Sequence, residues 1–282
     1  MSIPPRSISD RQDKPARVAG ELQIGDLVVC RLGFGAMRIT GDGVWGPPKD
    51  QETAKRVLRS AVDLGVNFID TADSYGPFVA DELIAEALYP YASDLVIATK
   101  AGYERSGPGS WKANARPDHL RKSCDDSLKR LRVEAIALFQ LHCVDPKVPL
   151  ADSLGALADL RRAGKVRNLG VSNVDLAQFQ LARDVLGVVS VQNRYNHDDR
   201  TSESILEACE EANVAFIPYA PLGSGRLARG EGGSKPVNEG GELTPAQASI
   251  VWLLRKSPVM LPIPGTSSLS HLHENIAAAS FA

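Results

Sequence analysis

The chain has 282 residues, 43% hydrophobic and 23% charged, which is ordinary for a globular protein with a large core. Its 32 Lys and Arg residues face 34 Asp and Glu residues, and a net charge of −2 leaves no excess of cations for a nucleic-acid partner. The cysteines stand far apart, at positions 30, 124, 143 and 209, which favours reduced thiols in a cytoplasm over a secreted disulfide framework.

The first part of the chain is expected to be a tail followed by a hairpin. Residues 1–17 are polar and proline-rich, which predicts a flexible tail without the apolar centre of a signal peptide. Residues 20–30 alternate around Gly25-Asp26, which predicts a short hairpin. No apolar run reaches the ~20 residues of a membrane span, so we expect a cytoplasmic protein with no membrane partner.

From residue 31 the chain alternates between short apolar runs and amphipathic stretches of helical period. The predicted strands cover residues 32–35, 66–69, 95–99, 136–141, 166–171, 188–191, 214–217 and 259–263. The predicted helices cover residues 51–64, 80–88, 117–131, 150–163, 175–185, 203–212, 245–256 and 269–279. Eight strand–helix pairs need a parallel sheet, so residues 18–282 are predicted to form a single α/β domain, a (β/α)8 TIM barrel with a short N-terminal hairpin.

Two features qualify this pattern. An open doubly wound sheet is the competing architecture, but the turn after the first strand lacks the third glycine of a dinucleotide loop, because Arg38 stands there. Residues 223–243 are rich in glycine and have no apolar period, which predicts a long flexible loop.

Ionisable residues end three successive predicted strands: Asp70, Lys100 and His142. Because barrel strands direct their carboxyl ends to one mouth, we expect these residues to meet there, with Tyr75 on the loop after Asp70. A nearby ammonium stabilises a phenolate, so we expect Lys100 to lower the pKa of Tyr75 towards neutrality. Each residue alone also fits a helix cap, a surface charge or a packed side chain, and only their joint occurrence indicates acid–base chemistry.

Short segments along the whole barrel resemble the aldo/keto reductase family. They are LGFGAM at 32–37, DTADSYG at 70–76, TK at 99–100, LH at 141–142, GVSN at 170–173, VQNRYN at 191–196, YAPLGS at 219–224 and IPGT at 263–266. The segments GVWGPP at 43–48 and IPGTSS at 263–268 are similar to a bacterial branch that includes pyridoxal reductases. The resemblance implies a nicotinamide-dependent reductase of a small-molecule aldehyde or ketone.

The resemblance also implies a role for individual residues. Tyr75 would be the general acid and Lys100 would lower its pKa, while Asp70 would pair with Lys100 and His142 would orient the carbonyl. The implied cofactor contacts are Gly35, Ala36, Met37, Ser172, Asn173, Gln192, Tyr219, Pro221, Leu222, Ser224, Gly265, Thr266, Ser267, Ser268, His271, Glu274 and Asn275.

The implied cofactor is NADPH. NADH is the alternative, because Gly265 and His271 stand where relatives usually carry Lys or Arg near the 2′-phosphate. Trp45 and Trp111 follow the first and third strands, and each fits a wall of the substrate pocket or a packing residue equally well.

A second function remains open: a cofactor-binding regulatory subunit of the same fold with little turnover. A metal-dependent hydrolase barrel is disfavoured, because no pair of histidines stands at strand ends and no metal ligands are expected. We expect a monomer.

Overall fold

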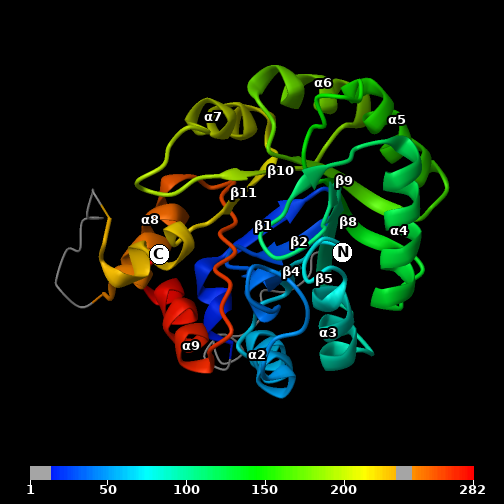
Figure 1. Ribbon diagram of the computed structural model, residues 1–282. Helices are drawn as coiled ribbons and strands as arrows, with labels where there is room; N and C mark the ends of the chain where they lie inside the picture. Colours follow the sequence, from blue (N-terminus) through cyan, green and yellow to red (C-terminus); the bar gives the residue numbers. More distant parts are fainter. Residues whose placement is uncertain (1–13, 233–242) are drawn as a thin grey trace, which may run out of the picture.

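The computed structural model describes residues 14–232 and 243–282 (Figure 1). Seven parallel strands form one curved sheet in the order β11-β10-β9-β8-β5-β4-β3, which confirms the predicted α/β fold. Their bounds are Phe34–Gly35 (β3), Phe68–Asp70 (β4), Val96–Ala101 (β5), Ile136–Leu141 (β8), Val166–Ser172 (β9), Ser190–Arg194 (β10) and Ala215–Tyr219 (β11).

An extended segment, residues 259–263, closes the sheet into a barrel. On one side, the N–H and C=O of Phe216 in β11 each bond to this segment at 2.9 Å. On the other side, the N–H of Gly33, just before β3, donates to it at 3.0 Å. The segment occupies the place of the eighth predicted strand without forming a regular one, because Pro262 and Pro264 have no N–H to donate.

Eight α-helices of the described chain surround the strands (Figure 1). They are Gln51–Asp63 (α2), Val79–Leu88 (α3), Pro117–Leu131 (α4), Leu150–Arg162 (α5), Leu176–Leu186 (α6), Glu203–Ala212 (α7), Pro245–Lys256 (α8) and Leu269–Ala277 (α9). The predicted start signal at Thr244 is present: its side chain accepts from the Gln247 N–H, and Pro245 begins α8. None of the described helices is long and apolar enough to cross a membrane.

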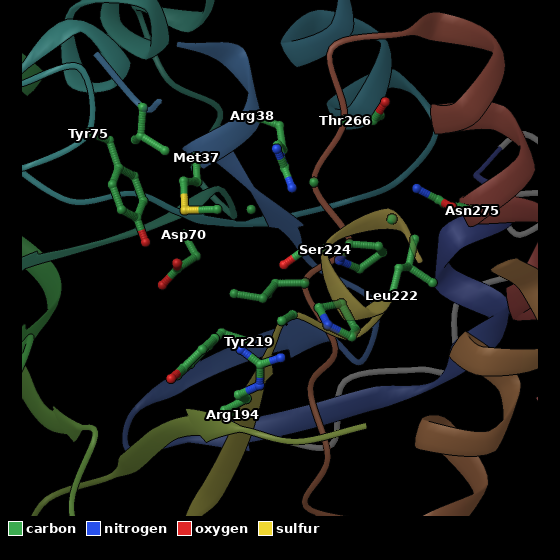
Figure 2. A pocket seen from close by; sticks show the side chains of 18 of the residues that line it. Met37, Arg38, Asp70, Tyr75, Arg194, Tyr219, Leu222, Ser224, Thr266 and Asn275 are labelled. Carbon is green, nitrogen blue, oxygen red and sulfur yellow. The ribbon is translucent and has the colours of Figure 1, made fainter. Parts of the chain in front are cut away.

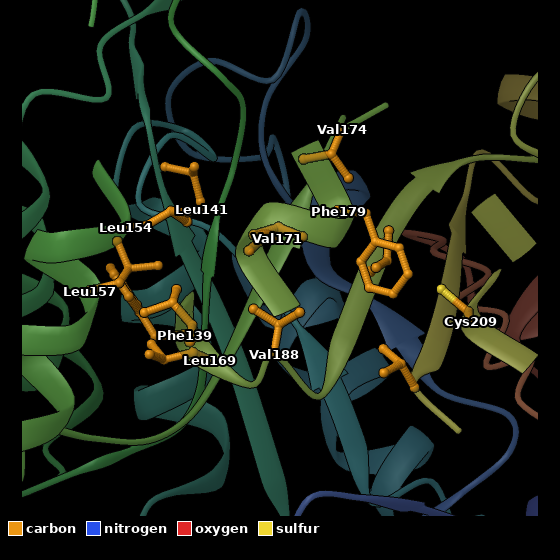
Figure 3. Close-up of a cluster of buried hydrophobic side chains, with 14 of the residues drawn as sticks. Phe139, Leu141, Leu154, Leu157, Leu169, Val171, Val174, Phe179, Val188 and Cys209 are labelled. Atoms are coloured by element: carbon orange, nitrogen blue, oxygen red, sulfur yellow. The ribbon is translucent and has the colours of Figure 1, made fainter. Parts of the chain in front are cut away.

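The main core lies between the sheet and its helices (Figure 3). Phe139 of β8 and Leu169 of β9 face Leu154 and Leu157 of α5, and Phe179 of α6 lies in the same cluster. All five side chains are fully buried, and each such burial contributes about 1.5–3 kcal/mol. This packing fixes the strands whose carboxyl ends carry the polar residues.

The predicted hairpin is present and covers the amino ends of the strands. Strands Glu21–Ile24 (β1) and Leu27–Cys30 (β2) pair antiparallel. Ile24 and Val29 are fully buried in a cluster with Phe68 and Val96, at or near the starts of β4 and β5. The hairpin therefore caps the end of the barrel opposite the predicted mouth.

Two predicted flexible segments contain ordered structure. Pro15–Ala19 forms a 3₁₀ helix whose Ala16 is fully buried and donates its N–H to Leu64, so the packed chain begins before residue 18. Within the predicted loop 223–243, Gly223–Gly225 and Leu227–Arg229 form 3₁₀ turns, and Leu227 of the second turn is buried. The rest of the tail, residues 1–13, and the loop residues 233–242 lie outside the described residues.

Candidate active site

A cavity of about 800 Å3 lies at the carboxyl ends of the strands (Figure 2). It brings together three of the four predicted catalytic residues: Asp70, Tyr75 and His142. Other predicted residues lining it are Gly35, Met37, Trp111, Ser172, Asn173, Gln192, Tyr219, Pro221, Leu222, Ser224, Gly265, Thr266, Ser267, His271, Glu274 and Asn275. Residues that are 240 positions apart in the chain therefore share one site, as the barrel topology requires.

Four predicted site residues do not line the cavity. Lys100 lies behind Asp70, and Ala36 packs into the core at the start of a 3₁₀ turn. Ser268 caps α9 with its side chain. Trp45 lies in the loop after β3, where it forms a bridge with Gly76.

Asp70 and Lys100 form a buried ion pair at the base of the site. The Nζ of Lys100 donates to Oδ1 of Asp70 at 2.6 Å and to the carbonyl of Thr71 at 2.8 Å, and both charged side chains are at most 1% exposed. Burial lowers the pKa of Lys100, and the attraction of Asp70 opposes this shift. Oδ2 of Asp70 accepts from the amide of Gln192 at 2.8 Å, so both carboxylate oxygens are bonded.

The phenol of Tyr75 differs from the prediction in its protonation. Its ring centroid lies 5.2 Å from Nζ of Lys100, as the expected pairing requires. However, burial raises the pKa of Tyr75 well above its usual value, and the negative charge of Asp70 raises it further. The expected lowering is therefore wrong for this geometry, because burial and the negative charge of Asp70 both raise the pKa. Tyr75 keeps its proton at neutral pH.

His142 is a neutral imidazole beside Tyr75. Burial lowers the pKa of His142 well below its usual value, and the charge of Lys100 acts in the same direction. Its Nδ1 lies 3.3 Å from the hydroxyl of Ser74, and its ring packs edge-on against Tyr75 with centroids 5.8 Å apart. When Ser74 donates to Nδ1, the imidazole proton is on Nε2, which suits donation to a carbonyl oxygen.

Polar side chains at the next strand ends are tied to one another. The amide of Asn173 donates to the carbonyl of His142 at 2.9 Å and accepts from the hydroxyl of Tyr219 at 2.9 Å. Asn173 has a φ of +56°, a left-handed conformation that asparagine adopts more readily than most residues. These contacts hold Tyr219, a half-buried ring, against the cavity.

The far end of the cavity is built around the start of α9. Thr266 and Asn275 lie there, with Ser224 and Leu222 between them and Tyr75 (Figure 2). The first N–H groups of a helix point towards its N-terminal end and favour an anion. The exposed imidazole of His271, on the same helix, also lines this end of the cavity.

Further cavity residues were not among those predicted from the sequence. Arg38 and Arg194 bring cations to the lining, and Tyr103 brings a second aromatic ring beside His142, at 4.8 Å between centroids. Alternation along β10 places Arg194 on the same side as Gln192, so its position could be read from the strand pattern. Tyr103 lies on a short strand, Tyr103–Glu104 (β6), that pairs with Lys112–Ala113 (β7), and no apolar period predicts such a hairpin.

A buried carboxyl lies behind the loop that carries Tyr75. Asp73 is 2% exposed, its Oδ1 has no hydrogen-bond partner among the described residues, and burial raises its pKa to about 7. A hydrogen bond from Ser123 and the charge of Arg130 act in the opposite direction, while Asp81 adds to the rise. This side chain is therefore the group near Tyr75 that changes its charge close to neutral pH.

Comparison with known proteins identifies the family of this chain. The model of the aldo/keto reductase family matches residues 31–282. Pyridoxine 4-dehydrogenase of Escherichia coli is 41% identical over 90% of this chain and 91% of its own. The structure of a glycerol dehydrogenase from Gluconobacter oxydans superposes with a TM-score of 0.81 at 27% identity, covering 94% and 90% of the two chains. An aldo/keto reductase from Klebsiella pneumoniae in complex with NADP and acetate has a TM-score of 0.75 at 25% identity, over 92% and 89%. The chain belongs to the aldo/keto reductase family.

Proposed function

We propose that the protein reduces an aldehyde or a ketone to an alcohol, with NADPH as cofactor and Tyr75 as the proton donor. The observation that carries the proposal is the convergence of a protonated phenol, a neutral imidazole and a buried ion pair at one end of a single cavity. The relative from Klebsiella pneumoniae that binds NADP supports the choice of cofactor.

The cavity residues fit a nicotinamide dinucleotide. The cavity volume of about 800 Å3 suits a molecule larger than a simple carbonyl compound. Tyr219 offers a ring face for the nicotinamide, and the oxygen of Gln192 is free of the bond that its amide nitrogen makes to Asp70. Thr266, Ser267 and the start of α9 offer donors to the adenosine phosphate.

When bound, the reduced nicotinamide supplies the hydride that reaches the carbonyl carbon. Tyr75 donates its proton to the carbonyl oxygen as negative charge develops there, and His142 orients that oxygen with Nε2. The phenolate left on Tyr75 lies near the ammonium of Lys100, which stabilises this charge and not the resting phenol. Asp70 holds the ammonium in place, and solvent then restores the proton of Tyr75.

The proposal is tested by following the loss of NADPH absorbance with a panel of aldehydes and ketones. We expect turnover that requires Tyr75. Tight NADPH binding without turnover of any carbonyl compound would overturn the proposal and indicate a regulatory subunit. The proposal includes a monomer, which sedimentation checks.

Cofactor choice is tested at His271. Arginine there adds a permanent, forked cation for the 2′-phosphate, so we expect His271→Arg to tighten NADPH binding by about 1 kcal/mol and to leave NADH binding unchanged. His273→Arg is the control, because His273 is also exposed on α9 and does not line the cavity. Equal effects of the two substitutions, measured by fluorescence titration with both cofactors, would contradict a contact between position 271 and the phosphate.

A further inference from the structure

Arg105 joins three separate loops beside the cavity. Its Nε donates to the carbonyl of Ser110 at 2.6 Å, within its own loop. Its Nη1 donates to Ser74 at 2.8 Å, next to Tyr75 on the loop after β4, and its Nη2 donates to Gly43 at 2.9 Å, on the loop after β3. The planar guanidinium of Arg105 therefore donates in three directions, to backbone carbonyls of three loops.

The loops joined by Arg105 come into direct contact. The carbonyl of Gly43 also accepts from the N–H of Gly109 at 3.0 Å. A Cβ on Gly43 would lie 2.8 Å from Cβ of Pro108, so the loop after β3 and the β6–β7 loop pack closely. Arg105 therefore adds hydrogen bonds to a contact that these two loops already make through their backbones.

The guanidinium also stacks on the indole of Trp111. Its Cζ lies 3.7 Å from the Trp111 ring centroid and 5.9 Å from that of Trp45. Trp111 lines the cavity and meets Tyr75 and His142 edge-on, with centroids 6.3 and 6.2 Å apart, whereas Trp45 does not line it. Arg105 therefore stacks on an indole that also contacts two of the proposed catalytic groups.

The chemistry of the position requires arginine. No carboxylate of the described residues forms an ion pair with Arg105, so its bonds go to neutral carbonyls and a π face. A lysine ammonium cannot reach three carbonyls in one plane while covering an indole. A cation stacked this closely on a ring attracts its π face, which favours one orientation of the half-exposed tryptophan.

We propose that Arg105 is a positioning residue that holds Trp111 as a flat wall of the substrate end of the cavity, and thereby sets a preference for ring-bearing over small aliphatic aldehydes. The inference rests on the proposed reductase activity. A fixed indole loses no further conformational entropy when a planar substrate stacks on it, whereas butanal has no ring to stack.

The test compares benzaldehyde with butanal in the parent protein and in Arg105→Met and Trp111→Leu. We expect each substitution to lower kcat/KM for benzaldehyde about tenfold, mainly through KM, the size of one aromatic contact. For butanal we expect a change of less than about threefold, and the Kd of NADPH stays the same. Trp45→Leu is the matched control, because it removes a ring beside Arg105 outside the cavity and leaves the ratio of the two aldehydes unchanged.

Two outcomes of these aldehyde assays would overturn the assignment. Equal losses for both aldehydes in Arg105→Met would show a general effect on the site, and parental selectivity in Arg105→Lys would show that the three-way fork is not needed.

A variant with Trp45 and Trp252 replaced by Phe keeps Trp111 as its sole tryptophan, and we expect benzyl alcohol to quench its emission less after Arg105→Met. That titration needs no turnover. If no aldehyde is reduced by the parent, the proposed function fails, while unchanged quenching in Arg105→Met refutes the role of Arg105 alone.

Discussion

At the scale of single residues, burial in one site shifts the pKa values of neighbouring groups in the directions that suit their proposed roles. Burial raises the pKa of Tyr75 and lowers the pKa values of Lys100 and His142, so each neutral form gains. Only Lys100 has a bonded carboxylate to retain its charge. The site therefore combines a phenol that holds a proton with a cation prepared for the phenolate.

Tyr75→Phe removes the proton donor and leaves the ring. We expect kcat to fall at least about 100-fold with little change in the Kd of NADPH, since general acid catalysis contributes about 10²–10⁴-fold. Tyr103→Phe removes a hydroxyl from the same cavity and serves as the control, with a much smaller effect expected. Steady-state kinetics and a cofactor titration give kcat and Kd for both variants. A near-parental kcat in Tyr75→Phe would show that Tyr75 is not the proton donor.

The Asp70–Lys100 pair is expected to be strongly coupled. Lys100→Met leaves a buried carboxylate and Asp70→Asn leaves a buried ammonium, and such uncompensated charges cost about 3–5 kcal/mol each. The double variant carries neither charge, so we expect it to be more stable than the sum of the single losses allows. Denaturant unfolding of the four proteins gives the coupling energy, and additive losses would show that the two charges do not interact.

Asp73 gives the folded protein a pH dependence. A carboxyl whose pKa rises from about 4 to about 7 on folding binds more protons in the folded state, so its contribution to stability is full at low pH and is lost as the pH rises towards 7. We expect Asp73→Asn to gain stability relative to the parent as the pH rises from about 4 to about 7. Thermal melts of both proteins across this range test the sign, and a constant difference would place the titration elsewhere.

At the scale of elements, sequence patterns predict what local physics determines. Asp70 and His142 were found because parallel strands direct their carboxyl ends to one mouth, and the structure places both there. Lys100 has the same strand-end signal but lies behind Asp70, because a charge pair is formed by tertiary contacts that no period encodes. Arg105 was missed for a related reason: its partners are carbonyls of three loops, and backbone groups leave no mark in a sequence.

Helix α6 offers a local test, because it begins with a capping box. The side chain of Asp175 accepts from the N–H of Gln178, whose own side chain accepts from the N–H of Asp175. We expect Asp175→Ala to lower the free energy of unfolding by about 1 kcal/mol without loss of activity. Asp184→Ala, an exposed acid on the same helix, is the control and is expected to have almost no effect. Equal losses in denaturant titrations would show that the cap contributes nothing.

At the scale of the whole molecule, three buried clusters share one sheet, so we expect them to unfold together. Tryptophan fluorescence and far-ultraviolet circular dichroism should give one midpoint. Bound NADPH should raise that midpoint, with a gain of about 2.7 kcal/mol at a concentration 100 times its Kd. Separate midpoints for the two probes, or a midpoint that ignores NADPH, would contradict this prediction.

The segment 259–263 has a further consequence for the heated protein. By bonding to Phe216 and to Gly33 it covers both margins of the curved sheet, so neither β3 nor β11 offers a free row of amides and carbonyls to another molecule. One of its five positions is Pro262, and Pro264 directly follows the segment, which therefore forms fewer bonds than a regular strand. When this segment detaches on heating, the edges of β3 and β11 are exposed together, and each can pair with a strand of another molecule. Heated samples are therefore expected to precipitate in a concentration-dependent way before most of their helices have melted.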